Sequence, residues 1–283
     1  MKVVLAERIG FCFGVKRAVR MSEGALKKYR RICSIGPLIH NSRVVEDLSQ
    51  RGLKVVKGLS GVRKGAVLIS SHGISPKTAS RITSRRLAMV DTTCPFVLNA
   101  QKAAARMRSE GYSVVIVGDS KHPEVMALMD FASGDVKVVK DEHEAAGLGI
   151  GKGSRVSVLS QTTQSPENFL KVVKVILGKK PGELRVFNTI CSDAEERQEF
   201  ARRLAGKVDL MLIMGGRNSA NTKRLLEVCR KVQKNSRLIE TDRELRKAWF
   251  DNRVRVVGIA SGASTPDRVV REAVKKIHRK GVV

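Results

Sequence analysis

The chain has 283 residues, 42% of them hydrophobic and 4% aromatic, a composition that supports a substantial core in roughly two or three domains. It begins without the apolar core of a signal peptide, and no apolar stretch approaches the roughly 20 residues that span a bilayer, so we expect a cytoplasmic protein with reduced thiols and no membrane association. The formal net charge of +27 predicts attraction to anions. The basic residues are spread along helix-like segments, which favours solvent-exposed helix faces over a dedicated nucleic-acid-binding surface.

Short apolar runs alternate with amphipathic segments along the whole chain. Each apolar run is followed by a turn and a helix-like stretch, which predicts an α/β fold with mainly parallel sheets. The clearest expected strands are residues 67–70, 114–118, 156–160, 210–216 and 254–262.

Three cysteines share one local context. Cys12, Cys94 and Cys191 each follow a strand-like run and a short turn, and each precedes a helix-like segment. A thiol at the start of a helix feels the positive end of the helix dipole, which lowers its pKa and favours the thiolate. Three thiolates suit iron–sulfur or zinc, and they leave one coordination position without a cysteine, where chemistry can occur.

The spacing of these cysteines divides the chain into thirds. The thiols lie 82 and 97 residues apart, which is the size of a small α/β unit. We therefore predict three similar units in a pseudo-threefold trefoil around a central metal site, with the boundaries 1–96, 97–192 and 193–283.

The other two cysteines fit a structural role. Cys33 lies inside an apolar run, and Cys229 joins Leu225 and Leu226 on one face of a helix-like segment. A single buried thiol usually behaves as a small hydrophobic residue. Because the sequence contains no C-x-x-C pair, zinc-finger and thioredoxin-type sites are disfavoured.

Polar residues gather where the expected strands end. Ligands of open α/β sheets bind outside the carboxyl ends of the strands. One such residue alone is usually a turn residue or a helix cap, but here the set is large. It comprises His40, His72, His122, Glu124, Thr162, Ser219, Asn221 and Ser264.

Nine motifs in a fixed order make this pattern specific. They are GFCFGVKRA, IGPLIHN, SHGI, DTTCPFV, GDSKHPEV, QTTQS, NTIC, GGRNSANT and GASTPD, spread from residue 10 to residue 267. Together they closely resemble the LytB-type 4-hydroxy-3-methylbut-2-enyl diphosphate reductases, the terminal enzymes of the methylerythritol phosphate isoprenoid pathway. The resemblance covers essentially the whole chain. It implies an oxidoreductase that removes the hydroxyl of this allylic diphosphate to form isopentenyl diphosphate and dimethylallyl diphosphate.

The resemblance also implies roles for single residues. Cys12, Cys94 and Cys191 match the three ligands of a [4Fe–4S] cluster whose fourth iron is open to the substrate oxygen. Glu124 matches the residue implicated in delivering protons to the substrate, and Thr162 matches the residue whose hydroxyl orients the substrate oxygen. The diphosphate-binding positions match His40, His72, Ser219, Asn221 and Ser264, with His122 lining the same pocket.

The residue types suit this chemistry independently of the resemblance. Breaking an allylic C–O bond requires two electrons and protons, which an open cluster iron and a proton donor can supply. A carboxyl such as Glu124 is a suitable proton donor if burial raises its pKa. Backbone N–H groups at a helix start, as in NSANTKRLL, can hold a diphosphate.

Two residues depart from the family pattern. Ala220 stands where many relatives carry a second serine, so one hydroxyl contact is lost. Asp193 places a negative charge in the first turn after Cys191, which favours the helix start and would lower the cluster potential. Neither departure removes a cluster ligand or the proton donor.

Two alternatives stay open on the residues alone. A basic nucleic-acid-binding module with a structural metal is supported by the charge, but scarce aromatic residues and the lack of a nucleic-acid motif argue against it. A different three-cysteine enzyme, such as a hydratase, would share only the open metal site. For the reductase, the basic surface predicts an acidic electron donor such as ferredoxin or flavodoxin.

Overall fold

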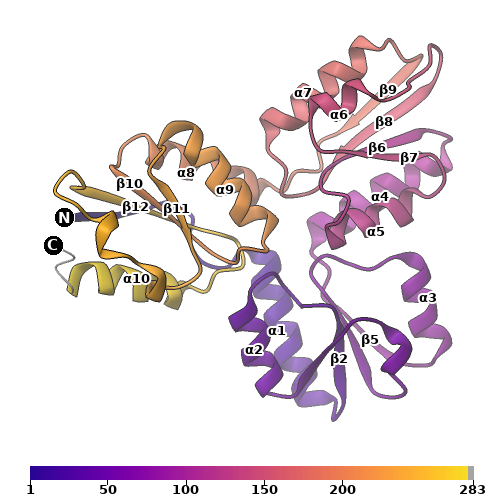
Figure 1. Ribbon diagram of the computed structural model, residues 1–283. Helices are drawn as coiled ribbons and strands as arrows, with labels where there is room; N and C mark the ends of the chain where they lie inside the picture. The colour runs from indigo at the N-terminus through magenta and orange to yellow at the C-terminus, as the bar shows by residue number, and fades with distance from the viewer. Residues whose placement is uncertain (280–283) are drawn as a thin grey trace. The chain divides into compact units, whose positions relative to one another are not determined.

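The fold consists of three four-stranded parallel sheets with flanking helices (Figure 1). The computed structural model describes residues 1–279, and residues 280–283, with which the predicted third unit ends, lie outside them. All five strands expected from the apolar runs are present, and the α/β prediction is confirmed. No helix within residues 1–279 is long and apolar enough to cross a membrane.

The first sheet has the strand order β3-β2-β4-β5. Its strands are β2 (Ile32–Ile35), β3 (Leu53–Val56), β4 (Ala66–Ile69) and β5 (Ala88–Asp91). Its helical segments are α1 (Phe13–Lys28), α2 (Ser42–Gln50), η1 (Leu59–Gly61) and α3 (Pro76–Ser84).

The second sheet has the strand order β7-β6-β8-β9. Its strands are β6 (Ser113–Val117), β7 (Val136–Val139), β8 (Arg155–Ser160) and β9 (Glu183–Phe187). Its helices are α4 (Pro95–Ser109), α5 (Pro123–Ala132), α6 (Glu142–Ala146) and α7 (Pro166–Gly178).

The third sheet takes one strand from the start of the chain. Its order is β1-β12-β10-β11, and β1 pairs in parallel with β12 so that Lys2 lies opposite Val256. The strands are β1 (Lys2–Leu5), β10 (Leu210–Met214), β11 (Ser236–Ile239) and β12 (Val256–Ser261). The helical segments are α8 (Ser192–Ala205), α9 (Ala220–Val232), η2 (Asp242–Glu244), η3 (Lys247–Trp249) and α10 (Asp267–Arg279).

The three sheets share one topology. In each, the first strand (β2, β6 or β10) is central, the second (β3, β7 or β11) is an edge, the third (β4, β8 or β12) is central and the fourth (β5, β9 or β1) is the other edge. The third sheet obtains its fourth strand from the N-terminus. The chain folds as two compact units, residues 1–16, 40–44 and 192 onward with the third sheet, and residues 17–39 and 45–191 with the other two. The predicted boundaries and trefoil stay predictions.

The second sheet shows how the strands are held. Successive side chains of a strand point to opposite faces. Val114 and Ile116 pack with residues of α4 and α5, whereas Val115 and Val117 pack with residues of α7. Helices cover both faces (Figure 1), which explains why the strand is apolar throughout instead of alternating. Burying each such side chain contributes roughly 1.5–3 kcal/mol.

Candidate active site

The three predicted ligand cysteines occupy equivalent positions in the three sheets. Each follows the fourth strand of its sheet and immediately precedes a helix, α1, α4 or α8. Each backbone N–H donates to a carbonyl beyond the neighbouring strand, from Cys12 to Ala263 at 3.0 Å, from Cys94 to Ser71 at 3.0 Å and from Cys191 to Thr162 at 2.9 Å. All three thiols are half-buried and free of disulfide bonds.

The thiol of Cys12 differs from the sequence prediction in its acidity. Burial raises its pKa, and this effect outweighs the hydrogen bond that the Val15 N–H donates to Sγ at 3.4 Å. The negative charge of Asp193 also raises the pKa, while the guanidinium of Arg197 lowers it. The prediction that the helix start lowers the pKa is therefore wrong for Cys12, because desolvation of the thiolate is the larger effect.

The other predicted residues follow the two central strands of each sheet. Because the strands of a sheet are parallel, their carboxyl ends meet at one edge, and each sheet places its cysteine at the same edge. The loops after the first strands carry His40, His122 and Ser219, and the helices that follow the last two begin with Glu124 and Asn221 in their first turns. The loops after the third strands carry His72, Thr162 and Ser264.

Glu124 is a buried carboxyl group held by one partner residue. It lies in the first turn of α5 and is only 2% exposed. Its Oε1 accepts from the Thr162 backbone N–H at 2.6 Å, and its Oε2 accepts from the Thr162 hydroxyl at 3.0 Å. Burial raises the pKa of Glu124 to about 7 although both of these bonds lower it. Glu124 therefore meets the condition for a proton donor, a carboxyl whose pKa is raised by burial.

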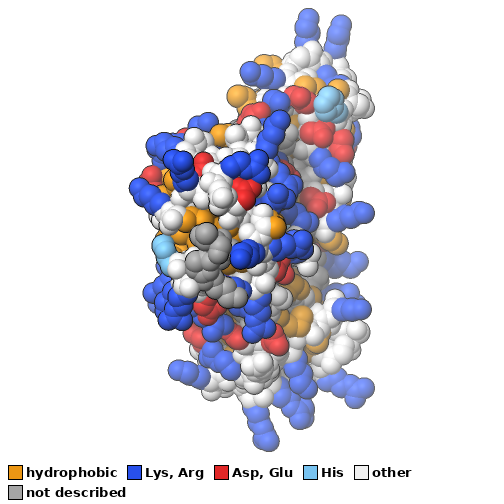
Figure 2. Space-filling model, turned by 60° about the vertical axis from the view of Figure 1, so that its left-hand side comes forward, with side chains coloured by type: hydrophobic (Ala, Val, Ile, Leu, Met, Phe, Trp, Pro, Cys, Tyr) orange, Lys and Arg blue, Asp and Glu red, His pale blue; other side chains and the backbone are white. Residues whose placement is uncertain are grey.

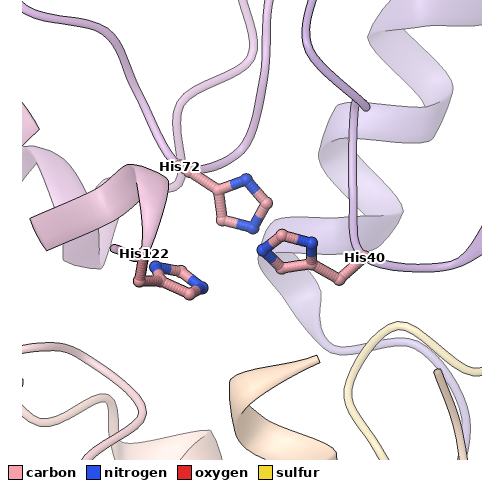
Figure 3. Close-up of side chains that lie close together, drawn as sticks. All are labelled: His40, His72 and His122. Carbon is pink, nitrogen blue, oxygen red and sulfur yellow. The ribbon is translucent and has the colours of Figure 1, made fainter. Parts of the chain in front are cut away.

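His122 caps the helix that carries Glu124. Its Nδ1 accepts from the Glu124 N–H at 3.2 Å. Its ring meets that of His72 edge-on, with 5.4 Å between the ring centroids (Figure 3). The α3 and α7 helices, which also begin with proline, have Ser75 and Ser165 at this position. A cysteine or histidine is a weaker capping residue than serine, so its presence before α4 and α5 indicates another role.

These contacts link six predicted residues within one compact unit. The chain of contacts runs from Cys191 through the Thr162 carbonyl to Glu124, and from the Glu124 N–H to His122. It continues across the ring contact to His72, whose neighbour Ser71 accepts from the Cys94 N–H. Two cysteines, two histidines, the carboxyl and the threonine hydroxyl thus form one connected group.

A second group forms in the other compact unit. The Ser264 hydroxyl donates to the His40 carbonyl at 3.2 Å, and Asn41 Nδ2 donates to the Ser264 carbonyl at 2.8 Å. Ala263, which accepts from Cys12, is the preceding residue. Burial, and secondly the charge of Lys223, lowers the pKa of His40, which favours a neutral imidazole that can both donate and accept.

Asn221 is the least satisfied polar side chain of this group. It is 5% exposed, and neither Oδ1 nor Nδ2 has a hydrogen-bond partner among the described residues. Ser219, by contrast, caps α9 by accepting from the Thr222 N–H at 3.3 Å. Leaving a buried polar group unpaired costs roughly 1–3 kcal/mol. The Asn221 amide is therefore available for a polar ligand at the start of α9.

Sequence reasoning missed Arg197, a buried cation beside Cys12. Its side chain is 2% exposed and its Nε lies 2.6 Å from Asp193 Oδ2. Its Nη1 donates to the carbonyls of Ser261 at 3.3 Å and Arg8 at 3.4 Å. It therefore ties α8 to the end of β12 and to the segment before Cys12. The spacing of four residues from Asp193 is the signal that could have revealed it.

The two cysteines expected to be structural fit that role. Cys33 and Cys229 are buried, and burial raises the pKa of Cys229 to about 12, as expected of an inert thiol. Lys121 and Arg217, which flank two of the loops, are exposed. Basic side chains cover the visible surface with fewer acidic ones between them (Figure 2).

The match to known proteins covers nearly the whole chain. The model of the LytB protein family matches residues 3–278. The chain belongs to the LytB family. Its relatives include proteins named 4-hydroxy-3-methylbut-2-enyl diphosphate reductase. That of Geobacter sulfurreducens is 47% identical over 277 residues, which are 98% of this chain and 97% of the relative. That of Geobacter metallireducens is 44% identical with the same coverage of both chains.

Solved LytB-type structures agree with this membership. The E-1-hydroxy-2-methyl-but-2-enyl-4-diphosphate reductase of Plasmodium falciparum matches with a TM-score of 0.93 at 25% identity, covering 99% of this chain and 89% of that one. A second structure is described as (E)-4-hydroxy-3-methyl-but-2-enyl diphosphate reductase, the terminal enzyme of the non-mevalonate pathway. It matches with a TM-score of 0.71 at 38% identity, covering 98% of this chain and 99% of that one.

Proposed function

We propose that this LytB-family chain reduces 4-hydroxy-3-methylbut-2-enyl diphosphate to isopentenyl diphosphate and dimethylallyl diphosphate with a [4Fe–4S] cluster. The names of relatives at 44% and 47% identity support this activity. The observation that carries it is the buried carboxyl of Glu124, which is held by Thr162 and has a pKa near neutrality. Such a group can act as a general acid that donates a proton to a bound substrate.

The proposed cluster ligands are Cys12, Cys94 and Cys191. Their chemistry fits, because three half-buried thiols outside any disulfide, at equivalent strand ends, offer soft ligands on backbone that is fixed by hydrogen bonds. They would leave one iron without a cysteine. When bound, such a cluster supplies electrons and a Lewis-acidic iron for the leaving oxygen.

The reaction balances with two electrons and two protons. The allylic C–O bond breaks, the oxygen leaves as water, and a C–H bond forms at either end of the allyl system. An external donor supplies the electrons, and the basic surface favours an acidic protein such as a ferredoxin or flavodoxin. The chain itself must bind the diphosphate, orient the hydroxyl and deliver protons.

Glu124 and Thr162 are the proposed groups for the proton and the hydroxyl. At neutral pH a carboxyl with a pKa of about 7 is protonated in a substantial fraction of molecules, so it can give up a proton without a large penalty. The Thr162 hydroxyl, 3.0 Å from Oε2, can orient the substrate oxygen and connect it to that proton. Both groups are buried, which excludes competing water.

The diphosphate is assigned to His40, His72, His122, Ser219, Asn221 and Ser264. The unpaired Asn221 amide and the start of α9 supply donors that would offset the desolvation of an anion. A neutral imidazole at His40 can donate one hydrogen bond while it accepts another. Ala220 offers only backbone at this helix start, so the anion relies more on Ser219 and Asn221.

Anaerobic purification tests this function. We expect a brown protein that contains iron and sulfide and converts the hydroxylated allylic diphosphate to the two five-carbon products when an artificial reductant is present. A colourless zinc protein without this turnover would contradict the proposal.

A further inference from the structure

A basic groove lies on the first sheet, apart from the residues assigned above. It has a volume of about 850 Å³, and five of its eleven lining residues are cationic, against 54 of 283 in the whole chain. No aspartate or glutamate lines it. The cations of this basic groove are Arg30, Arg31, Lys54, Arg63 and Lys64.

The basic groove is at the amino ends of the strands. Its cations precede β2 and β4 or lie in the first half of β3. His72 and Cys94 follow the carboxyl ends of β4 and β5 in the same sheet. Because the strands are parallel, the basic groove and these two residues lie at opposite edges of the sheet. A ligand in the basic groove would therefore not compete with one held near His72.

The backbone of the basic groove is held by a hydrogen bond and a close contact at Arg31. Its carbonyl accepts from the Ala66 N–H at 2.9 Å. Gly65 has a φ of +106°, and a Cβ there would come within 2.4 Å of the Arg31 oxygen. Only glycine allows this contact, which sets Arg31 and Lys64 beside each other on adjoining loops.

The five cations have no acidic partners within residues 1–279. Elsewhere the chain pairs many exposed arginines with carboxylates, such as Arg106 with Glu110 at 2.7 Å. Like charges gathered around one concave surface repel each other and focus a positive potential into it. A bound anion would relieve this repulsion.

The dimensions favour a small ligand over a nucleic acid. The volume falls within the range of roughly 300–1,000 Å³ that is typical of small-molecule sites. A smaller cavity of about 360 Å³ adjoins it and shares Arg30, Arg31 and Lys64, with Tyr29 as an aromatic wall. Single-stranded nucleic acids need a row of aromatic platforms, whereas these two cavities offer one ring.

We propose that the basic groove is a second anion site, which binds a small molecule with three or more phosphate groups. Several cations around one cavity match several phosphates, each of which takes charge-assisted hydrogen bonds. Tyr29 can stack against a base if the phosphates belong to a nucleotide. The proposal does not depend on the reductase activity.

Calorimetric titration of tripolyphosphate tests the site. The protein is kept at roughly physiological salt, where non-specific charge attraction is screened beyond about 8 Å, and saturated with isopentenyl diphosphate. We expect one tripolyphosphate per chain and weaker binding of inorganic phosphate. The double variant Arg31→Ser, Lys64→Ser should bind at least about a hundredfold more weakly, since each lost charge-assisted bond contributes about a factor of ten or more.

The matched control removes two cations outside the basic groove. Lys152 and Lys174 are exposed in the same compact unit, and Lys152→Ser, Lys174→Ser should bind tripolyphosphate like the wild type. Equal weakening in both double variants, or no change in the first, would overturn the site. Displacement of tripolyphosphate by isopentenyl diphosphate would also overturn the site. So would RNA that binds more tightly than tripolyphosphate, with an affinity that grows with RNA length up to 20 nucleotides. Tighter binding of ATP than of tripolyphosphate, lost in Tyr29→Ala, identifies a nucleotide as the ligand class.

Discussion

Thr162 holds both carboxyl oxygens of Glu124, one through its backbone N–H at 2.6 Å and one through its hydroxyl at 3.0 Å. The two residues come from α5 and from the loop after β8. This pair fixes the direction of the carboxyl group while burial raises its pKa to about 7.

Glu124→Gln should separate binding from chemistry. Glutamine keeps the shape and hydrogen bonds of the side chain but has no acidic proton, so turnover should fall by roughly 10²- to 10⁴-fold. Substrate should still perturb the absorption spectrum of the proposed iron–sulfur cluster. Glu167, which also follows a proline in the first turn of its helix but is exposed, supplies the control Glu167→Gln. Wild-type turnover in Glu124→Gln would move the proton-donor role to another group.

The same carboxyl should make stability depend on pH. Because its pKa is raised from 4.5 to about 7, the folded chain keeps a proton that the unfolded chain releases. The resulting stabilisation is complete below about pH 4.5 and is lost as the pH rises through about 7. The unfolding free energy of the wild type relative to Glu124→Gln should fall by about 3 kcal/mol over this window. Denaturant titrations at several pH values measure it, and a constant difference would contradict the assigned pKa.

Cysteine substitutions should sort the five thiols into two classes. Cys94→Ser should lose stable cluster binding and activity, as should the corresponding changes at Cys12 and Cys191. Cys33→Ser and Cys229→Ser should retain iron and sulfide, since both thiols are buried away from the strand-end loops. Chemical analysis of iron and sulfide after anaerobic purification decides this, and a full complement in Cys94→Ser would refute its role as a ligand.

Arg197→Met should destabilise the segment before Cys12. The change leaves Asp193 without its partner and frees the carbonyls of Arg8 and Ser261, so we expect a loss of about 3 kcal/mol. Arg202→Met, at an exposed position of the same helix, should cost little. Chemical denaturation of the metal-free chains compares them. Equal stability of the two variants would show that Arg197 does not hold this segment.

Electron delivery should depend on salt if the donor is an acidic protein. A basic surface attracts such a donor over distances that about 0.1 M salt screens beyond roughly 10 Å. Turnover with a ferredoxin or flavodoxin should therefore slow steeply with added salt, while turnover with a small neutral mediator should not. A flat salt response with the protein donor would remove electron-donor docking as the reason for the charge of +27.

The sequence by itself determined the strands, the family and the positions of the cysteines. Buried parallel strands such as residues 114–117 require unbroken apolar runs, and glycine, proline and helix-cap residues mark where strands and helices end. Because these signals are local, the sequence shows them directly. Cys94 before Pro95 and His122 before Pro123 mark helix starts in the same way. Glu124 was identified as a candidate proton donor, but whether its pKa is raised depended on burial in the folded chain.

Only the tertiary structure decided which distant residues meet. The pairing of β1 with β12 joins residues more than 250 positions apart, and no local pattern shows that the N-terminal strand completes the third sheet. Burial likewise depends on neighbours from other elements, which is why Cys12 has a raised pKa although its helix start alone favours the thiolate. The same dependence on distant neighbours applies to Arg197, Asn221 and the basic groove. Their chemistry follows from which partners surround them or are missing, and the packing of the folded chain sets both.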